Sequence, residues 1–156
     1  MPWIENCAAD DIPRAHHHDA GPNSMLIQIT DPASWKPKPL HVFKETHHFE
    51  FLDIEDNDHA DDTEMFISES QAKELIRLLR HAQENRMNVV VHCFAGVCRS
   101  GAVVEVGTHM GFEAVEKFRS PNTRVMRLMM AELGLPYEVP HHNWREDYRQ
   151  YIGVKF

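Results

Sequence analysis

Val89-Val-Val-His-Cys-Phe-Ala-Gly-Val-Cys-Arg-Ser-Gly101 is the stretch of this sequence that decides the fold. Its three valines form a continuous apolar run, which is typical of a strand buried on both faces of a sheet. A short loop follows, and residues 102–110 can continue as a helix. Because a buried strand that leads through a loop into a helix is the building unit of α/β layers, we expect an α/β fold. Its central, mostly parallel sheet should be flanked by helices.

The loop after the valine run combines a thiol with groups that attract an anion. Backbone N–H groups at the start of a helix and in a tight loop favour negative charge. Gly96 permits backbone angles that other residues avoid. Arg99 carries a permanent charge on a planar fork that suits phosphate oxygens, and this charge should favour the thiolate form of Cys93. The loop therefore predicts a nucleophile beside a phosphate cradle.

The remaining sequence supplies further elements of an α/β layer. Strands are expected over residues 25–30 and 47–55. Ser68-Glu-Ser-Gln71 resembles a capping box, so a helix should begin there and end near residue 86. Residues 122–133 have an amphipathic helical pattern, and residues 141–151 can form a short helix. Residues 8–24 and 33–41 read as loops, and we expect one domain over residues 1–156 with residues 1–24 as an irregular N-terminal segment.

Composition and charge exclude several classes of partner. The formal net charge is −8 over 156 residues, which argues against nucleic acid and anionic membranes as partners, since both require a basic surface. No apolar run is long enough to span a bilayer, and no signal peptide is apparent. The cysteines are few and odd in number, which favours a reducing compartment such as the cytoplasm: Cys7, Cys93 and Cys98. The sequence leaves the oligomeric state open.

The central loop resembles the signature of the protein tyrosine phosphatase superfamily, in which His-Cys is followed by five residues and then Arg-Ser or Arg-Thr. Here the Cys-x5-Arg loop reads His92-Cys93, five residues, Arg99-Ser100. Among these enzymes the small dual-specificity phosphatases are most similar. They often carry Ser-Pro-Asn before a late helix, as Ser120-Pro121-Asn122 does here. The resemblance covers about residues 25–133 and implies a phosphatase-like fold.

The resemblance implies a role for each residue of the loop. Cys93 would attack phosphorus and form a phosphocysteine intermediate, and Ser100 would hydrogen-bond the departing thiolate. His92 and Asn122 would orient the loop. Phosphate would be bound by the residues between the nucleophile and the helix: Phe94, Ala95, Gly96, Val97, Cys98 and Arg99. This chemistry needs no metal and no cofactor.

A general acid must protonate the leaving oxygen, and the acidic loop over residues 56–65 should supply it. Asp58 fits the spacing Phe51-x-x-Ile54-x-x-x-Asp58 that several dual-specificity enzymes show. Asp56 lies in Ile54-Glu55-Asp56-Asn57, which resembles the acid segment of other members. Both candidates stay open at this point, with Asp56 preferred.

Cys98 creates a Cys-x4-Cys-Arg-Ser pattern, which the low-molecular-weight tyrosine phosphatases also have. Their loop lies near the N-terminus, so that fold is not expected here. Cys98 could still form a disulfide with Cys93 on oxidation and protect the nucleophile. The alternative is that it packs the loop as a small side chain.

The expected substrate is a phosphoprotein carrying phosphotyrosine, with phosphoserine and phosphothreonine as further candidates. The loop interior has no lysine, which disfavours highly charged inositol lipids. Two other functions are considered: a phosphate-binding pseudophosphatase module and a rhodanese-like sulfurtransferase. The histidine runs, at residues 16–18, 47–48 and 141–142, are interpreted as solvated side chains and not as metal ligands.

Overall fold

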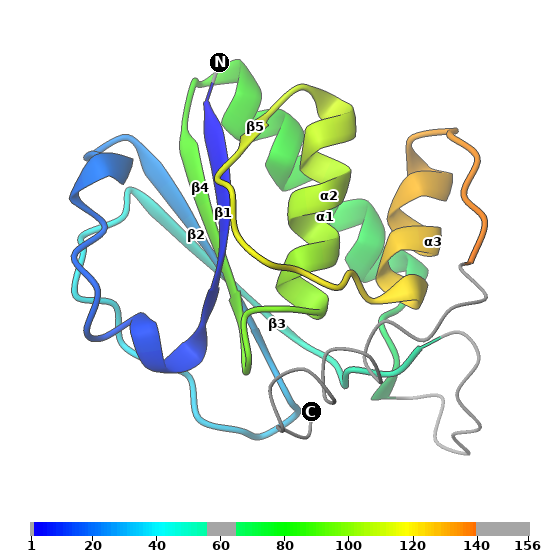
Figure 1. Cartoon of the computed structure of the whole chain (residues 1–156), viewed down its shortest axis with the longest axis horizontal. Helices are drawn as coiled ribbons and strands as arrows, with labels where there is room; N and C mark the ends of the chain where they lie inside the picture. Colours follow the sequence, from blue (N-terminus) through cyan, green and yellow to red (C-terminus); the bar gives the residue numbers. More distant parts are fainter. Residues whose placement is uncertain (1, 56–64, 140–156) are drawn as a thin grey trace.

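The computed structural model describes residues 2–55 and 65–139, which form a five-stranded sheet with three α-helices (Figure 1). The strands are β1 (Trp3–Ala8), β2 (Ser24–Thr30), β3 (Glu45–Glu50), β4 (Asn88–Cys93) and β5 (Glu113–Ala114). Their order across the sheet is β3-β2-β4-β1-β5, and every neighbouring pair is parallel. The predicted α/β fold with a parallel sheet is therefore confirmed.

The three helices pack against one face of this sheet. They are α1 (Glu69–Glu84), α2 (Arg99–Met110) and α3 (Thr123–Glu132), close to their predicted limits. The capping box at the start of α1 is present, because Ser68 accepts from the Gln71 backbone and the Gln71 side chain accepts from the Ser68 backbone. Apolar side chains of these helices join those of the sheet in one continuous core.

Irregular segments with two short 3₁₀ turns cover the opposite face of the sheet. The predicted α-helices therefore lie on one face only and do not cover both. Ile12 is fully buried there and packs with Leu26 and Val90, which lie on β2 and β4. Two 3₁₀ turns (Ala9–Asp11 and His18–Ala20) belong to this covering, which Figure 1 shows in blue beside the strands. The amide of Gln28 donates to the Pro37 carbonyl at 2.8 Å and fastens the loop that follows β2.

The prediction that residues 1–24 are irregular is wrong for residues 3–8. These residues form β1, an inner strand between β4 and β5. The sequence concealed the strand because Glu5 and Asn6 interrupt its apolar pattern. Asn6 is nevertheless only 1% exposed. Its buried side chain hydrogen-bonds the loop after β4, as described below.

The predicted strand over residues 47–55 is too long at its carboxyl end. β3 ends at Glu50. The Phe51 backbone N–H still donates to the Thr30 carbonyl at the end of β2, and the Leu52 N–H already donates to the Met65 carbonyl outside the sheet. Residues 51–54 therefore lie beyond the carboxyl ends of the strands, where ligands bind in open α/β sheets. The predicted helix at residues 141–151 falls outside the described residues. Within residues 2–55 and 65–139, none of the helices is long and apolar enough to cross a membrane.

Candidate active site

A cavity of about 330 Å³ lies at the carboxyl end of β4. It collects residues from three segments that are distant in the sequence: the turn after β2, the segment after β3 and the loop between β4 and α2. Its lining comprises Asp31, Leu52, Asp53, Ile54, Cys93, Phe94, Ala95, Cys98 and Arg99. Cys93 therefore shares one cavity with four of the residues predicted to bind phosphate, namely Phe94, Ala95, Cys98 and Arg99.

Cys93 ends β4 and is 2% exposed. Its Sγ lies 3.2 Å from the Oγ of Ser100, which is in the first turn of α2. A hydroxyl at this distance can donate a hydrogen bond to a thiolate, and such charge-assisted bonds are about twice as strong as neutral ones. The role that the resemblance implies for Ser100 needs this contact, and the role itself stays a prediction.

Arg99 is held from one side only. Its Nη1 donates to Asp31 Oδ1 and to the Phe51 carbonyl oxygen, both at 2.7 Å. Its Nε is buried and has no hydrogen-bond partner among the described residues. Because an unsatisfied buried donor costs about 1–3 kcal/mol, the fold carries this penalty at Arg99.

The loop keeps its shape because Gly96 lies against β1. Gly96 has a φ of +73°, and a Cβ at this position would lie 2.3 Å from the Cys7 carbonyl carbon and 2.4 Å from the Ala8 nitrogen. The Asn6 side chain donates to the Gly96 carbonyl at 2.7 Å and to that of Phe118 at 3.2 Å. β1 is therefore the surface on which the loop is built, and this explains the buried Asn6.

Asn122 connects the loop to the segment after β3. Its backbone N–H donates to the Cys98 carbonyl, and its side-chain oxygen caps α3 by accepting from Val125. Its Nδ2 donates to Asp53 Oδ1 at 2.7 Å and to the Ile54 carbonyl at 3.2 Å. Asn122 thus joins the loop to the segment after β3, and its predicted orienting role stays a prediction.

A family model for protein-tyrosine phosphatases matches residues 34–130, more than half of the chain. The chain belongs to the protein-tyrosine phosphatase family. The predicted membership is therefore confirmed, and it places the chain among the cysteine-dependent protein phosphatases. No curated protein sequence matches significantly.

Two solved structures of phosphatases resemble the chain weakly. The first is OH1, a tyrosine phosphatase from the Orf virus, with 19% identity and a TM-score of 0.44 over 86% of this chain and 61% of OH1. The second is human DUSP28, with 15% identity and a TM-score of 0.49 over 90% of this chain and 85% of DUSP28. Since both TM-scores are below 0.5, the family assignment rests on the family model.

His92 directly precedes Cys93 and is fully buried. Burial, with smaller contributions from the charges of His48 and Arg99, lowers its pKa to about 4, although the Cys93 backbone opposes the shift. His92 is therefore neutral at pH 7, and both of its ring nitrogens are buried without a hydrogen-bond partner among the described residues, so its orienting role stays a prediction.

The structure adds four lining residues that sequence reasoning missed, namely Asp31, Leu52, Asp53 and Ile54. The predicted acids Asp56 and Asp58 fall outside the described residues, so their assignment stays a prediction. Asn6 was also missed, and only the position of β1 could have revealed it. Gly96 and Val97 shape the loop without lining the cavity; the Val97 carbonyl accepts from the Ser120 backbone.

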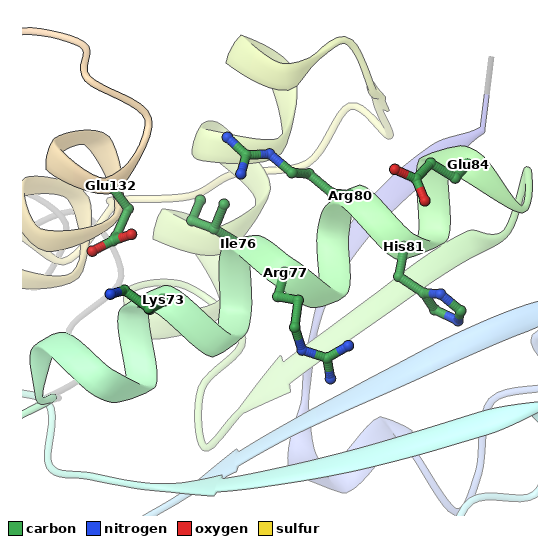
Figure 2. A pocket seen from close by; sticks show the side chains of 7 residues that line it. All are labelled: Lys73, Ile76, Arg77, Arg80, His81, Glu84 and Glu132. Atoms are coloured by element: carbon green, nitrogen blue, oxygen red, sulfur yellow. The ribbon is translucent and has the colours of Figure 1, made fainter.

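Two further cavities that are lined by described residues lack a cysteine. Figure 2 shows one of about 520 Å³ along α1, where Lys73, Arg77, Arg80 and His81 project from the helix and no cysteine contributes. Another, of about 580 Å³, is lined by His16, His18 and His41. Among the described residues no three histidine, cysteine or acidic side chains are grouped so as to hold a metal ion.

We predict that Gly96→Ala, in the loop between β4 and α2, lowers the free energy of unfolding more than Gly134→Ala does. Both glycines have similar positive φ angles, +73° and +71°, but a Cβ at Gly134 meets no atom within 4 Å. Gly134→Ala should cost about 1–2 kcal/mol of strain. Gly96→Ala should cost about 2–5 kcal/mol because steric overlap is added. Urea unfolding of both variants measures this, and equal losses would contradict the contact with β1.

We predict that His92 makes stability fall as the pH falls from 6.5 to 4. In this interval the unfolded state binds a proton on His92 that the folded state rejects, since the folded pKa is about 4. The contribution is complete above pH 6.5 and shrinks by up to about 3 kcal/mol at pH 4. Urea unfolding at pH 7 and pH 5 should show a smaller loss for His92→Gln than for the native protein. Identical losses would show that His92 is not held neutral.

Proposed function

We propose that this protein hydrolyses phosphotyrosine in phosphoproteins through a phosphocysteine intermediate, with phosphoserine and phosphothreonine as further candidate substrates. One observation carries the proposal: the unpartnered, buried Nε of Arg99 belongs to a side chain that lines the same cavity as the nucleophile Cys93. A phosphate placed there meets a permanent cation and a thiol together.

The proposed reaction has two displacement steps. The Cys93 thiolate attacks phosphorus, the bond from phosphorus to the leaving oxygen breaks, and that oxygen takes a proton from a general acid. The amides of residues 94–99 and the Arg99 guanidinium hold the equatorial oxygens as charge builds on them. Water then attacks phosphorus, the S–P bond breaks, and Ser100 donates to the departing thiolate, which it reaches over 3.2 Å.

Two features support phosphotyrosine as the substrate group. Leu52 and Ile54 give the cavity an apolar wall, and Phe94 on its rim is 80% exposed. These side chains suit a phenyl ring, which packs well against apolar and aromatic surfaces. The absence of lysine from residues 94–98 supports a phosphoprotein over an inositol lipid with several phosphates.

We also propose that residues 1–156 form one phosphatase domain, although the family model matches from residue 34 onward. The support is β1, which lies outside that match and carries the backbone against which Gly96 packs. The proposed compartment is the cytoplasm, since a thiolate nucleophile works only where thiols stay reduced.

We propose in addition that Cys98 protects the nucleophile. Cys93 and Cys98 are both 2% exposed and line the same cavity. Peroxide oxidises the Cys93 thiolate to a sulfenic acid, and the Cys98 thiol then displaces water from it to form a disulfide. After mild peroxide treatment, peptide mass spectrometry should find a Cys93–Cys98 bridge that a reductant removes. Sulfinic acid at Cys93 without a bridge would exclude the protection.

We predict that the native protein hydrolyses para-nitrophenyl phosphate between pH 5 and 8 with a chelator present. Cys93→Ser should lower kcat by at least roughly a thousandfold, as the loss of a nucleophile does in other covalent enzymes. Circular dichroism should show that the variant is folded. A folded, reduced native protein that binds phosphate without turnover would indicate a pseudophosphatase module. Sulfur transfer from thiosulfate would indicate the sulfurtransferase chemistry.

A further inference from the structure

The loop over residues 94–98, between β4 and α2, has backbone carbonyls that accept hydrogen bonds from donors outside the loop. The pairs are Ala9 N–H to Phe94 at 3.2 Å, Asn6 Nδ2 to Gly96 at 2.7 Å, Ser120 N–H to Val97 at 3.1 Å and Asn122 N–H to Cys98 at 2.9 Å. These donor residues do not belong to the lining of the cavity that contains Cys93. Among them Asn6 donates through its side chain, so this is the contact that a side-chain substitution removes.

These hydrogen bonds also set the direction of the amide groups in the loop. The peptide bonds of the described residues are all trans, and in a trans peptide the N–H points opposite to the carbonyl. Since the Gly96 carbonyl points to Asn6 on β1, the N–H of Val97 points away from β1. A loop whose successive N–H groups turn to one side forms a nest that binds an anion.

The burial of Asn6 carries a cost that the packing of a strand does not require. Its Nδ2 donates to the carbonyls of Gly96 and Phe118, at 2.7 and 3.2 Å, so both amide hydrogens are used. Its Oδ1 is buried and has no hydrogen-bond partner among the described residues, which is destabilising. An apolar side chain would fill this inner strand without that penalty. What offsets the cost is therefore the placement of the two carbonyls that Asn6 holds.

We propose that Asn6 is a positioning residue of this phosphatase: it holds the Gly96 carbonyl against β1 and thereby turns the Val97 N–H toward a phosphate in the cavity. The inference rests on the proposed function, and Asn6 itself does not line the cavity. Without this donor the peptide between Gly96 and Val97 can rotate, since glycine permits backbone angles that other residues avoid. A carbonyl turned into the cavity would repel the phosphate oxygens that the N–H otherwise binds.

Two substitutions test this role. Asn6→Ala removes the donor and adds no charge. Asn6→Asp keeps the shape of asparagine: a protonated aspartate has one O–H that can donate to the Gly96 carbonyl, whereas an ionised one has only acceptors. Burial should raise the pKa of this carboxyl, while Lys117, which donates to the Asn6 carbonyl at 3.2 Å and is paired with Glu5 at 2.6 Å, opposes the shift. The contact to Gly96 should therefore be present at pH 5 and lost at pH 9.

Asn88→Ala and Asn88→Asp are the matched controls. Asn88 also links its strand to neighbouring segments, because its Nδ2 donates to the Ala20 carbonyl at 3.2 Å and its Oδ1 accepts from the Trp3 N–H at 3.0 Å. It lies at the amino end of β4, however, whereas Cys93 lies at the carboxyl end. These variants should lose stability and keep the catalytic rate of the folded protein.

Two quantities are measured from pH 5 to pH 9, each divided by the native value at the same pH and corrected for the folded fraction by circular dichroism. The first is kcat/KM with para-nitrophenyl phosphate. The second is the concentration of inorganic phosphate that halves the rate at which iodoacetamide alkylates Cys93, a measurement that needs no turnover.

We expect Asn6→Ala to lose kcat/KM by up to roughly 10²–10³-fold at every pH, which is the effect of removing a donor to a transition-state oxyanion. It should also need more phosphate to protect Cys93. Asn6→Asp should show the same loss at pH 9 and approach the native value at pH 5. A role in stability alone would not produce this rescue by acid in the folded protein.

Three outcomes would overturn the proposal. The first is a folded Asn6→Ala with native kcat/KM and native phosphate protection or, where this variant does not fold, an Asn6→Asp whose ratio to the native protein is constant from pH 5 to pH 9. The second is an equal loss in the Asn88 variants, which would indicate a general effect of stability. If the native protein shows no turnover, the proposed function fails and phosphate protection decides: weaker protection in the Asn6 variants alone supports the positioning role, and equal protection, the third outcome, excludes it.

Discussion

The contact between Gly96 and the backbone of β1 is the constraint on which the rest of the site depends. A side chain at Gly96 would overlap the carbonyl carbon of Cys7, so only glycine lets the loop rest on this strand. Asn6 completes the contact by binding the Gly96 carbonyl. With the middle of the loop fixed in this way, its two ends, Cys93 and Arg99, face the same cavity. The fold itself therefore places the Cys93 thiol and the Arg99 guanidinium at one cavity, as the proposed reaction would require.

The sequence predicted well those features that depend on local patterns. The valine run of β4, the capping box of α1 and the spacing from Cys93 to Arg99 are all determined by near neighbours in the chain. β1 was missed because its pairing partner, β4, lies 85 residues further on. Its apolar pattern is also interrupted by Asn6, whose side chain hydrogen-bonds the loop at Gly96. Asp53 was missed for another reason. The alternating pattern after Phe49 predicts that β3 continues, and an acid within a strand is normally a solvent-facing side chain and not a site residue.

Asn122 both caps a helix and holds residues that line the candidate site. The side-chain oxygen caps α3, as small polar residues commonly do at this position. The remaining donors of the same residue hold Asp53, Ile54 and the carbonyl of Cys98. Thr123, next in the chain, donates to Glu55 through its backbone N–H at 2.6 Å and extends the same connection. The stability of α3 and the geometry of the cavity lining are therefore coupled, and a substitution at Asn122 should disturb both at once.

The inner position of β1 has a consequence for synthesis of the chain on the ribosome. β2 and β3 lie about 20 residues apart and can pair soon after both have been made. β1 pairs only with β4 and β5, so it has no partner in the sheet until translation has advanced by 85 residues. At about 5–20 residues per second, the strand waits roughly 4–17 seconds. The loop over residues 94–98 is synthesised directly after β4 and rests on β1 through Gly96, so it cannot take its observed shape until that waiting strand has been inserted.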